Sequence, residues 1–186
     1  MKKVIFKKSI AAEEYVNKPI CEKIKKTLKE YKKKKLLRKR SNQDGVQTVN
    51  VEDNEIATFL LNCFADCIKK NYKPKKELTC VINNFWINEN KKGSKNAAHT
   101  HPESDFSGVY YVEVPKNSGN IRFEHFDMHD QNLSHYFFDD EFFDAYNIFN
   151  KQYQFLIFPS SYIHEVEISK SPRSRISVSF NVTIKR

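Results

Sequence analysis

The sequence predicts a mainly β, α+β protein: an antiparallel sandwich or barrel with helices packed on one side. The hydrophobic repeat changes from about 3.6 residues to 2 near Leu78. Beyond that point come short strand-like runs separated by turn signals, with no helix between them. A length of 186 residues is enough for one core. We therefore expect a single domain over residues 1–186, with a helical part at about 11–71 and a barrel at about 78–186.

Composition excludes several other classes of protein. No apolar run reaches the roughly 20 residues of a membrane span, and the first residues lack the apolar segment of a signal peptide. These features predict a cytoplasmic protein, of a cell or of an infected host. The four cysteines form no CxxC pair, so we expect free thiols in a core. They are Cys21, Cys63, Cys67 and Cys80.

The first helix is predicted to be basic. Weak alternation over Lys3–Phe6 suggests a short strand, and residues 11–15 suggest a helix or loop. Helical spacing of apolar residues then predicts an amphipathic helix from Pro19 to about residue 38. Much of the net charge of +9 lies in Lys23–Arg40. Such a segment is either a solvated helix face or a surface for an acidic or nucleic-acid partner.

A second helix is the clearest element in the chain. Its apolar residues form one broad stripe, with Asp53 or Asn54 as the cap and Lys69–Asn71 as the end. The stripe consists of Ile56, Phe59, Leu60, Cys63, Phe64, Cys67 and Ile68. We expect this helix to lie against a sheet and to hold no chemistry.

Seven strands are predicted after the helices. They cover residues 79–87, 97–101, 109–114, 120–125, 153–158, 162–168 and 175–184. The acidic and aromatic region 126–151 is too long for a hairpin turn. It is predicted to be either a lid or binding loop or a short helix that buries its phenylalanines.

Metal-ligand residues are concentrated just before one of these strands. His99, His101 and Glu103 are spaced two apart, so their side chains share one side of an extended chain. His164 lies on a late strand. Two histidines and a carboxylate with open positions suit non-haem Fe(II). The pair beside His164 is either His101 with Glu103 or His99 with His101, so His99 and Glu103 compete for one place.

Two further features qualify this ligand set. His125-x-Asp127 is a weaker alternative pair. The strand that precedes it fits better as a neighbour of the strand that carries the metal ligands. Downstream, Arg175 and Ser177 face one side of the last strand. A planar guanidinium with a nearby hydroxyl is suited to a dicarboxylate.

Taken together, the motifs resemble a known family. They are Trp86-Ile-Asn88, Asn96-Ala-Ala-His99-Thr-His101-Pro, Ser107-Gly-Val-Tyr-Tyr-Val, Ser118-Gly-Asn-Ile-Arg-Phe, Phe158-Pro-Ser-Ser-Tyr-Ile-His164 and Arg175-Ile-Ser-Val-Ser-Phe-Asn181. In this order they look like the 2-oxoglutarate/Fe(II)-dependent oxygenases, closest to an uncharacterised type frequent in phages and marine bacteria. Many relatives have H-x-D where this chain has H-x-H-x-E.

The resemblance implies a fold and roles for individual residues. The fold is the double-stranded β-helix, a cupin-like jelly-roll barrel. His164 corresponds to the distal iron ligand, and Arg175 and Ser177 correspond to residues that bind the C5 carboxylate of 2-oxoglutarate. Tyr111 lies where related hydroxylases place a tyrosine near the same carboxylate. No catalytic residue is expected beyond the metal ligands.

The expected activity is a dioxygenase that uses Fe(II), 2-oxoglutarate and O2 to hydroxylate a C–H bond of a substrate that the sequence does not name. Two alternatives stay open. One is a cupin-like metal-binding module without oxygenase activity, which a three-histidine set would favour. The other is a nucleic-acid-binding accessory protein that uses the basic helix.

Overall fold

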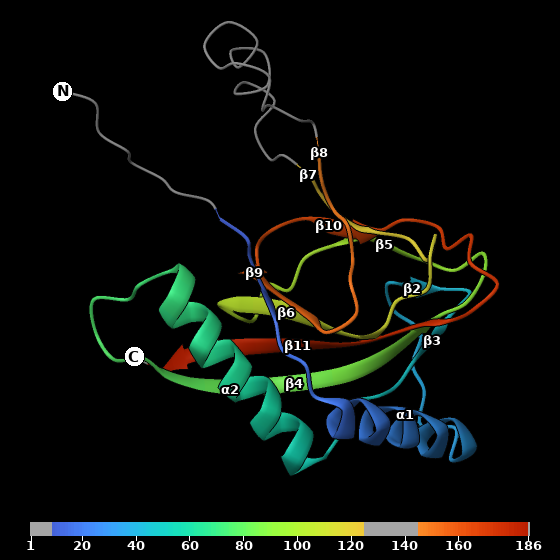
Figure 1. The fold of residues 1–186 in the computed structure, drawn as a ribbon, viewed down its shortest axis with the longest axis horizontal. Helices are drawn as coiled ribbons and strands as arrows, with labels where there is room; N and C mark the ends of the chain where they lie inside the picture. The colour runs from blue at the N-terminus through green and yellow to red at the C-terminus, as the bar shows by residue number, and fades with distance from the viewer. Residues whose placement is uncertain (1–8, 125–144, 186) are drawn as a thin grey trace, which may run out of the picture.

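Two antiparallel sheets face each other and enclose the interior of a barrel (Figure 1). The computed structural model describes residues 9–124 and 145–185. The larger sheet has the strand order β1-β9-β6-β11-β4-β3, and the smaller has the order β2-β5-β10-β7-β8. The strands are β1 Ala11–Glu14, β2 Asn42–Gln43, β3 Val46–Gln47, β4 Thr79–Asn90, β5 Lys95–His99, β6 Phe106–Glu113, β7 Ile121–Glu124, β8 Ala145–Ile148, β9 Gln154–Pro159, β10 His164–Val166 and β11 Arg175–Lys185.

The longest pairing in the larger sheet joins β11 to β4, and β6 pairs with the other edge of β11. Side chains alternate between the two faces of a strand. On β11, Val178 and Val182 therefore belong to the core on the outer face of the sheet, whereas Arg175 and Ser177 line a cavity between the sheets. One strand thus serves both the core and the interior of the barrel.

Two helices cover the outer face of the larger sheet (Figure 1). Helix α1 spans Lys18–Lys33 and is capped by Asn17, whose side chain accepts a hydrogen bond from the Ile20 amide. Helix α2 spans Asn54–Asn71, and Asp53 Oδ1 accepts from the amides of Glu55 and Ile56 at 3.1 Å each. Among the described residues, neither helix is long and apolar enough to cross a membrane.

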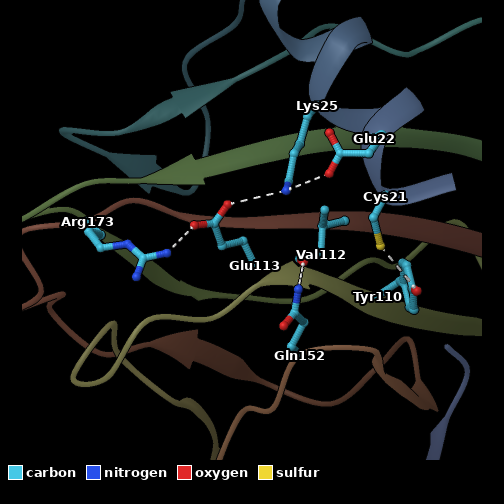
Figure 2. Close-up of polar contacts among 8 residues, drawn as sticks. All are labelled: Cys21, Glu22, Lys25, Tyr110, Val112, Glu113, Gln152 and Arg173. Atoms are coloured by element: carbon cyan, nitrogen blue, oxygen red, sulfur yellow. Dashed lines mark hydrogen bonds and ion pairs between the residues drawn. The ribbon is translucent and has the colours of Figure 1, made fainter. Parts of the chain in front are cut away.

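A chain of ion pairs ties α1 to the sheet beneath it (Figure 2). Glu113, at the end of β6, accepts from Arg173 at 2.8 Å and lies 3.7 Å from Lys25 of α1. Lys25 also pairs with Glu22 one turn earlier, at 3.0 Å. Arg173 lies just before β11, so the cluster links the helix layer to the start of the strand that carries Arg175.

The turn between β2 and β3 joins the two sheets at one edge of the barrel. Strand β2 pairs with β5 of the smaller sheet, and β3 pairs with β4 of the larger sheet. Asp44 has a φ of +56°, as a tight turn requires. Gly45 leaves no room for a side chain, because a Cβ there would lie 2.7 Å from the Glu89 carbonyl oxygen. This connection brings Ser41 to the wall of the barrel interior.

The fold class predicted from the sequence is confirmed, with corrections to single elements. Residues 11–15 were predicted to be helix or loop, but residues 11–14 form β1 at the edge of the larger sheet. The first helix ends at Lys33, because Lys35 adopts a φ of +56°. Within 126–151, residues 145–148 form β8, and the predicted lid or short helix falls largely on residues outside those that the structure describes. The predicted strand at 3–6 and the pair His125-x-Asp127 lie outside the described residues.

Candidate active site

Three histidines meet at the end of the smaller sheet. His99 ends β5 and is directly opposite His164 of β10 in the strand register. His101 lies two residues beyond β5, where its amide donates to the Ser160 carbonyl oxygen at 2.9 Å. One ligand atom of each histidine lies within 4.8 Å of the other two. With metal–nitrogen bonds of about 2.1 Å, two nitrogen atoms bound to one ion lie at most about 4.2 Å apart. Small side-chain rotations would therefore bring the three histidines within binding distance of one ion.

The ring arrangement keeps the three imidazoles together. Ring centroids are 4.4 Å apart for His99 and His164, 4.9 Å for His99 and His101, and 5.2 Å for His101 and His164. Phe158 packs against His164 from behind at 4.7 Å. The apolar wall fixes the ring and limits the access of water to it.

Backbone hydrogen bonds select the tautomer of two of these rings. His99 Nδ1 lies 2.8 Å from the Ala97 carbonyl oxygen, and His164 Nδ1 lies 2.9 Å from the Tyr162 carbonyl oxygen. A carbonyl oxygen only accepts, so each Nδ1 carries the proton. In the neutral ring, the lone pair of Nε2 is then free for a metal ion.

Burial keeps the imidazoles neutral. It lowers the pKa of His164 to about 3, with a smaller effect of the neighbouring His99. Burial also lowers the pKa of His101 to about 4, and the charges of His99 and Arg38 act in the same direction. The pKa of His99 is lowered by burial as well. Protons therefore compete weakly with a metal ion at neutral pH.

Glu103 does not join the three histidines. Strand β5 ends at His99, and the chain turns at Pro102 and Glu103, so the alternation that would align residue 103 with residue 101 is lost. Glu103 is exposed and lines a larger cavity beside the cluster. Of the two residues that compete for one place, the structure brings His99 next to His101 and His164.

A small cavity inside the barrel connects the histidines with Arg175 and Ser177. Arg175 is 2 % exposed. Its Nη1 donates to the Gly119 carbonyl oxygen at 2.7 Å, and its Nε has no hydrogen-bond partner among the described residues. Burial lowers the pKa of this guanidinium. A buried cation with an unused donor fits a carboxylate, which would accept from Nε and offset the charge.

The free volume of this cavity is about 40 Å³. Tyr111, the third residue predicted for the co-substrate, is buried beside this cavity and does not line it. The Arg175 guanidinium carbon lies 5.9 Å from the centre of the Tyr111 ring.

The asparagines of the site were missed in the sequence. Asn88 donates to Ser179 Oγ at 3.0 Å, and Asn90 donates to Asn96 Oδ1 at 3.0 Å, all within the wall of the small cavity. The signal was present, because Asn84, Trp86, Asn88 and Asn90 recur every second residue along one face of β4.

A second, larger cavity of about 800 Å³ opens on the other side of the histidines. The two cavities share four wall residues: Ser41, Trp86, His99 and His101. Arg38 and Arg40 line the larger cavity together with Glu103. The site therefore has a narrow inner part next to Arg175 and a wide outer part with charged walls.

Solved structures of low sequence identity share the fold. A Pseudomonas putida prolyl-4-hydroxylase aligns with a TM-score of 0.60 and 13 % identity, over 96 % of this chain and 93 % of its own. HygX from Streptomyces hygroscopicus, with nickel and 2-oxoglutarate bound, aligns with a TM-score of 0.64 and 8 % identity, over 95 % and 83 %.

A 2OG-Fe(II) oxygenase family protein from Burkholderia pseudomallei aligns with a TM-score of 0.54 and 15 % identity, over 80 % of this chain. The match covers 65 % of the Burkholderia protein, so this chain corresponds to a part of it. No curated protein matches the sequence.

A family model identifies the chain directly. The model described as "Putative 2OG-Fe(II) oxygenase" matches residues 84–181, which is more than half of the sequence. The matched span runs from β4 into β11, and it contains the three clustered histidines and Arg175. This protein belongs to the 2OG-Fe(II) oxygenase family.

Proposed function

We propose that this chain is a 2-oxoglutarate-dependent Fe(II) dioxygenase that hydroxylates a C–H bond, with His99, His101 and His164 as the iron ligands. One observation carries the proposal: three neutral imidazoles and one buried arginine with an unused donor line the same cavity. Three protein ligands leave positions for a co-substrate and O2. The helices and the barrel together, over residues 1–186, would form the oxygenase domain.

Each residue has a distinct part in the proposal. The carbonyl oxygens of Ala97 and Tyr162 hold His99 and His164 with Nε2 available for the metal. Arg175 and Ser177 bind the distal carboxylate of 2-oxoglutarate, and Tyr111 packs beside Arg175. Phe158 shields His164 from water. The neighbouring larger cavity receives the substrate next to the metal.

When bound, iron and 2-oxoglutarate together activate O2, so that one oxygen atom enters the substrate as a hydroxyl group and the other enters succinate, with release of CO2. The chain itself orients the co-substrate and limits water around the metal.

Anaerobic addition of Fe(II) and 2-oxoglutarate tests the proposal. We expect the weak visible charge-transfer band of the iron–keto acid chelate, and slow succinate formation once O2 is admitted. His164→Ala should abolish iron binding and turnover together. Full turnover by this variant would contradict the assignment.

A comparison of His99→Ala with Glu103→Gln tests the third ligand. The first substitution should remove iron binding, and the second should preserve it, because Glu103 lies on an exposed turn. Iron retention by His99→Ala together with loss in Glu103→Gln would reverse the choice. Iron binding without any succinate formation would favour the alternative, a metal-binding module on the same barrel.

The acidic or nucleic-acid partner of Lys23–Arg40 stays a prediction. Three of the α1 lysines are already paired: Lys23 with Glu55 at 2.6 Å, Lys25 with Glu22 at 3.0 Å and Lys32 with Glu89 at 2.7 Å. Nucleic-acid binding by the remaining charges should fall steeply as salt rises. A salt titration with duplex and single-stranded DNA measures this directly.

A further inference from the structure

Two arginines in the wall of the larger cavity, Arg38 and Arg40, have no counter-ion within the part of the chain that the structure describes. Arg38 and Arg40 line this cavity together with His99 and His101. None of the ion pairs formed among residues 9–124 and 145–185 involves either arginine. Burial lowers the pKa of Arg38, and repulsion by Arg40 adds to the effect. Glu103 is the one acidic residue among the described wall residues, and it forms no ion pair with either arginine, so the two like charges beside the cavity favour an anion between them.

Arg38 is held in place by three contacts. Its amide donates to the Gln47 carbonyl oxygen at 2.9 Å. Its guanidinium carbon lies 5.1 Å from the centre of the Trp86 ring, a cation–π contact. With the Gln47 amide oxygen turned toward both donors, that oxygen accepts from Arg38 Nε and from Trp86 Nε1, each at 3.2 Å. These contacts use Nε, so within the described ranges the two ends of the guanidinium are available to a ligand.

The same contacts place Arg38 next to the metal ligands. Trp86 lies between Arg38 and His101, with 5.7 Å between the Trp86 and His101 ring centroids. The charge of Arg38 also contributes to the low pKa of His101. A group bound by Arg38 would therefore lie within one small molecule's length of the histidine cluster.

We propose that Arg38, assisted by Arg40, binds an anionic group of the substrate, a carboxylate or a phosphate, and so places a neighbouring C–H bond at the metal. Gln47 and Trp86 are positioning residues that hold the guanidinium. The planar fork of arginine binds either oxyanion in bidentate fashion. Since this names the substrate class of the site described above, it rests on the proposed function.

Binding can be measured without turnover, because Trp86 is the single tryptophan of the chain. The full chain, loaded with Mn(II), is titrated with inorganic phosphate and with acetate at constant ionic strength, and Trp86 fluorescence is recorded. We expect a saturable change with at least one anion. Arg38→Gln should raise the apparent Kd at least tenfold, and Arg38→Lys should raise it less, because the charge is kept but the fork is lost.

Two control variants make the titration specific. Lys29→Gln removes one charge from an exposed position of α1 and should leave the Kd within about twofold. Arg175→Gln removes the other anion site and should preserve the Trp86 response. No saturable change in the wild type, or the same Kd in Arg38→Gln, would overturn the proposal.

Succinate formation then distinguishes the two kinds of anion. Paired compounds are compared: amino acids with their amides, and sugar phosphates with the free sugars. We expect only anionic members to raise the rate above the uncoupled level, and Arg38→Gln to lose that stimulation. Equal stimulation by neutral members would overturn the anion site. A normal fluorescence titration with no succinate under any condition would instead overturn the proposed oxygenase function.

Discussion

His164 and His101 make the stability of the metal-free protein depend on pH. Burial lowers their pKa values to about 3 and about 4, whereas an unfolded histidine titrates near 6.5. Below about pH 6.5 the unfolded chain binds protons that the folded chain does not, so stability is lost as pH falls through that window. The free energy of unfolding should fall by up to about 1.4 kcal/mol per pH unit for each histidine.

Urea unfolding of the metal-free protein between about pH 7 and pH 5 measures this slope. His164→Asn is the matched variant, because it cannot take up a proton. It should lose the contribution of one histidine and retain that of His101. An unchanged slope in this variant would mean that His164 titrates normally in the folded protein.

Substitution of Arg175 should weaken co-substrate binding much more than it lowers the stability of the fold. In Arg175→Met the buried charge is removed, so we expect unfolding free energy to change by less than about 2 kcal/mol despite the lost bond to Gly119. Iron binding should persist, and the KM for 2-oxoglutarate should rise at least tenfold. In the wild type, 2-oxoglutarate at about 100 times Kd should add about 2.7 kcal/mol of stability. If the variant gains the same protection, Arg175 does not bind the co-substrate.

At the residue scale, the sequence predicted the parts of the site that follow strand alternation. His99 and His101 were candidates, and His164 and Arg175 each fell on a late strand. Glu103 was a candidate by the same spacing, but a turn after His99 removed it from the cluster. Arg38 was read only as one charge of a basic segment, because its contact with Trp86 joins residues that are far apart in the chain.

Among the turns, the one before β7 should be sensitive to a single methyl group. Gly119 has a φ of +82°, and a Cβ there would lie 2.3 Å from the Glu167 carbonyl oxygen. Backbone strain alone costs about 1–3 kcal/mol. Gly119→Ala should exceed that cost and should also weaken 2-oxoglutarate binding, because the Gly119 carbonyl accepts from Arg175.

Gly93→Ala is the matched control for this turn. Gly93 has a similar φ of +87°, but a Cβ there would meet no other described atom within 4 Å. It therefore carries the strain without the clash. Chemical denaturation of both variants should give a larger loss of unfolding free energy for Gly119→Ala than for Gly93→Ala. Equal losses would rule out the clash.

Long periodic elements were predictable, and short ones were not. Helix α2 and strand β11 each have enough residues to display their period. Strands β2 and β3 have two residues each and are held by partners on opposite sheets, which local sequence does not reveal. Strand β1 is an edge strand whose pairing with β9 overrides a weak local preference.

In the whole molecule, exposed ion pairs should contribute little to stability. Glu113→Gln removes the contacts to Lys25 and Arg173, whose side chains are 27 % and 72 % exposed. We expect the free energy of unfolding to fall by less than about 1 kcal/mol, and by still less at high salt. Thermal unfolding at low and high salt checks both points. A larger, salt-independent loss would mean that the cluster fixes the position of α1 on the sheet.

Because β11 carries core residues and cavity residues in alternation, the two kinds of mutation are interleaved along one strand. Changes at Val178 or Val182 should affect folding, and changes at Arg175 or Ser177 should affect the binding of ligands. The same separation holds on β4, where Phe85 and Ile87 pack outward beside Trp86 and Asn88. New substrates can therefore be selected at alternate positions while the hydrophobic face that keeps the barrel folded stays unchanged.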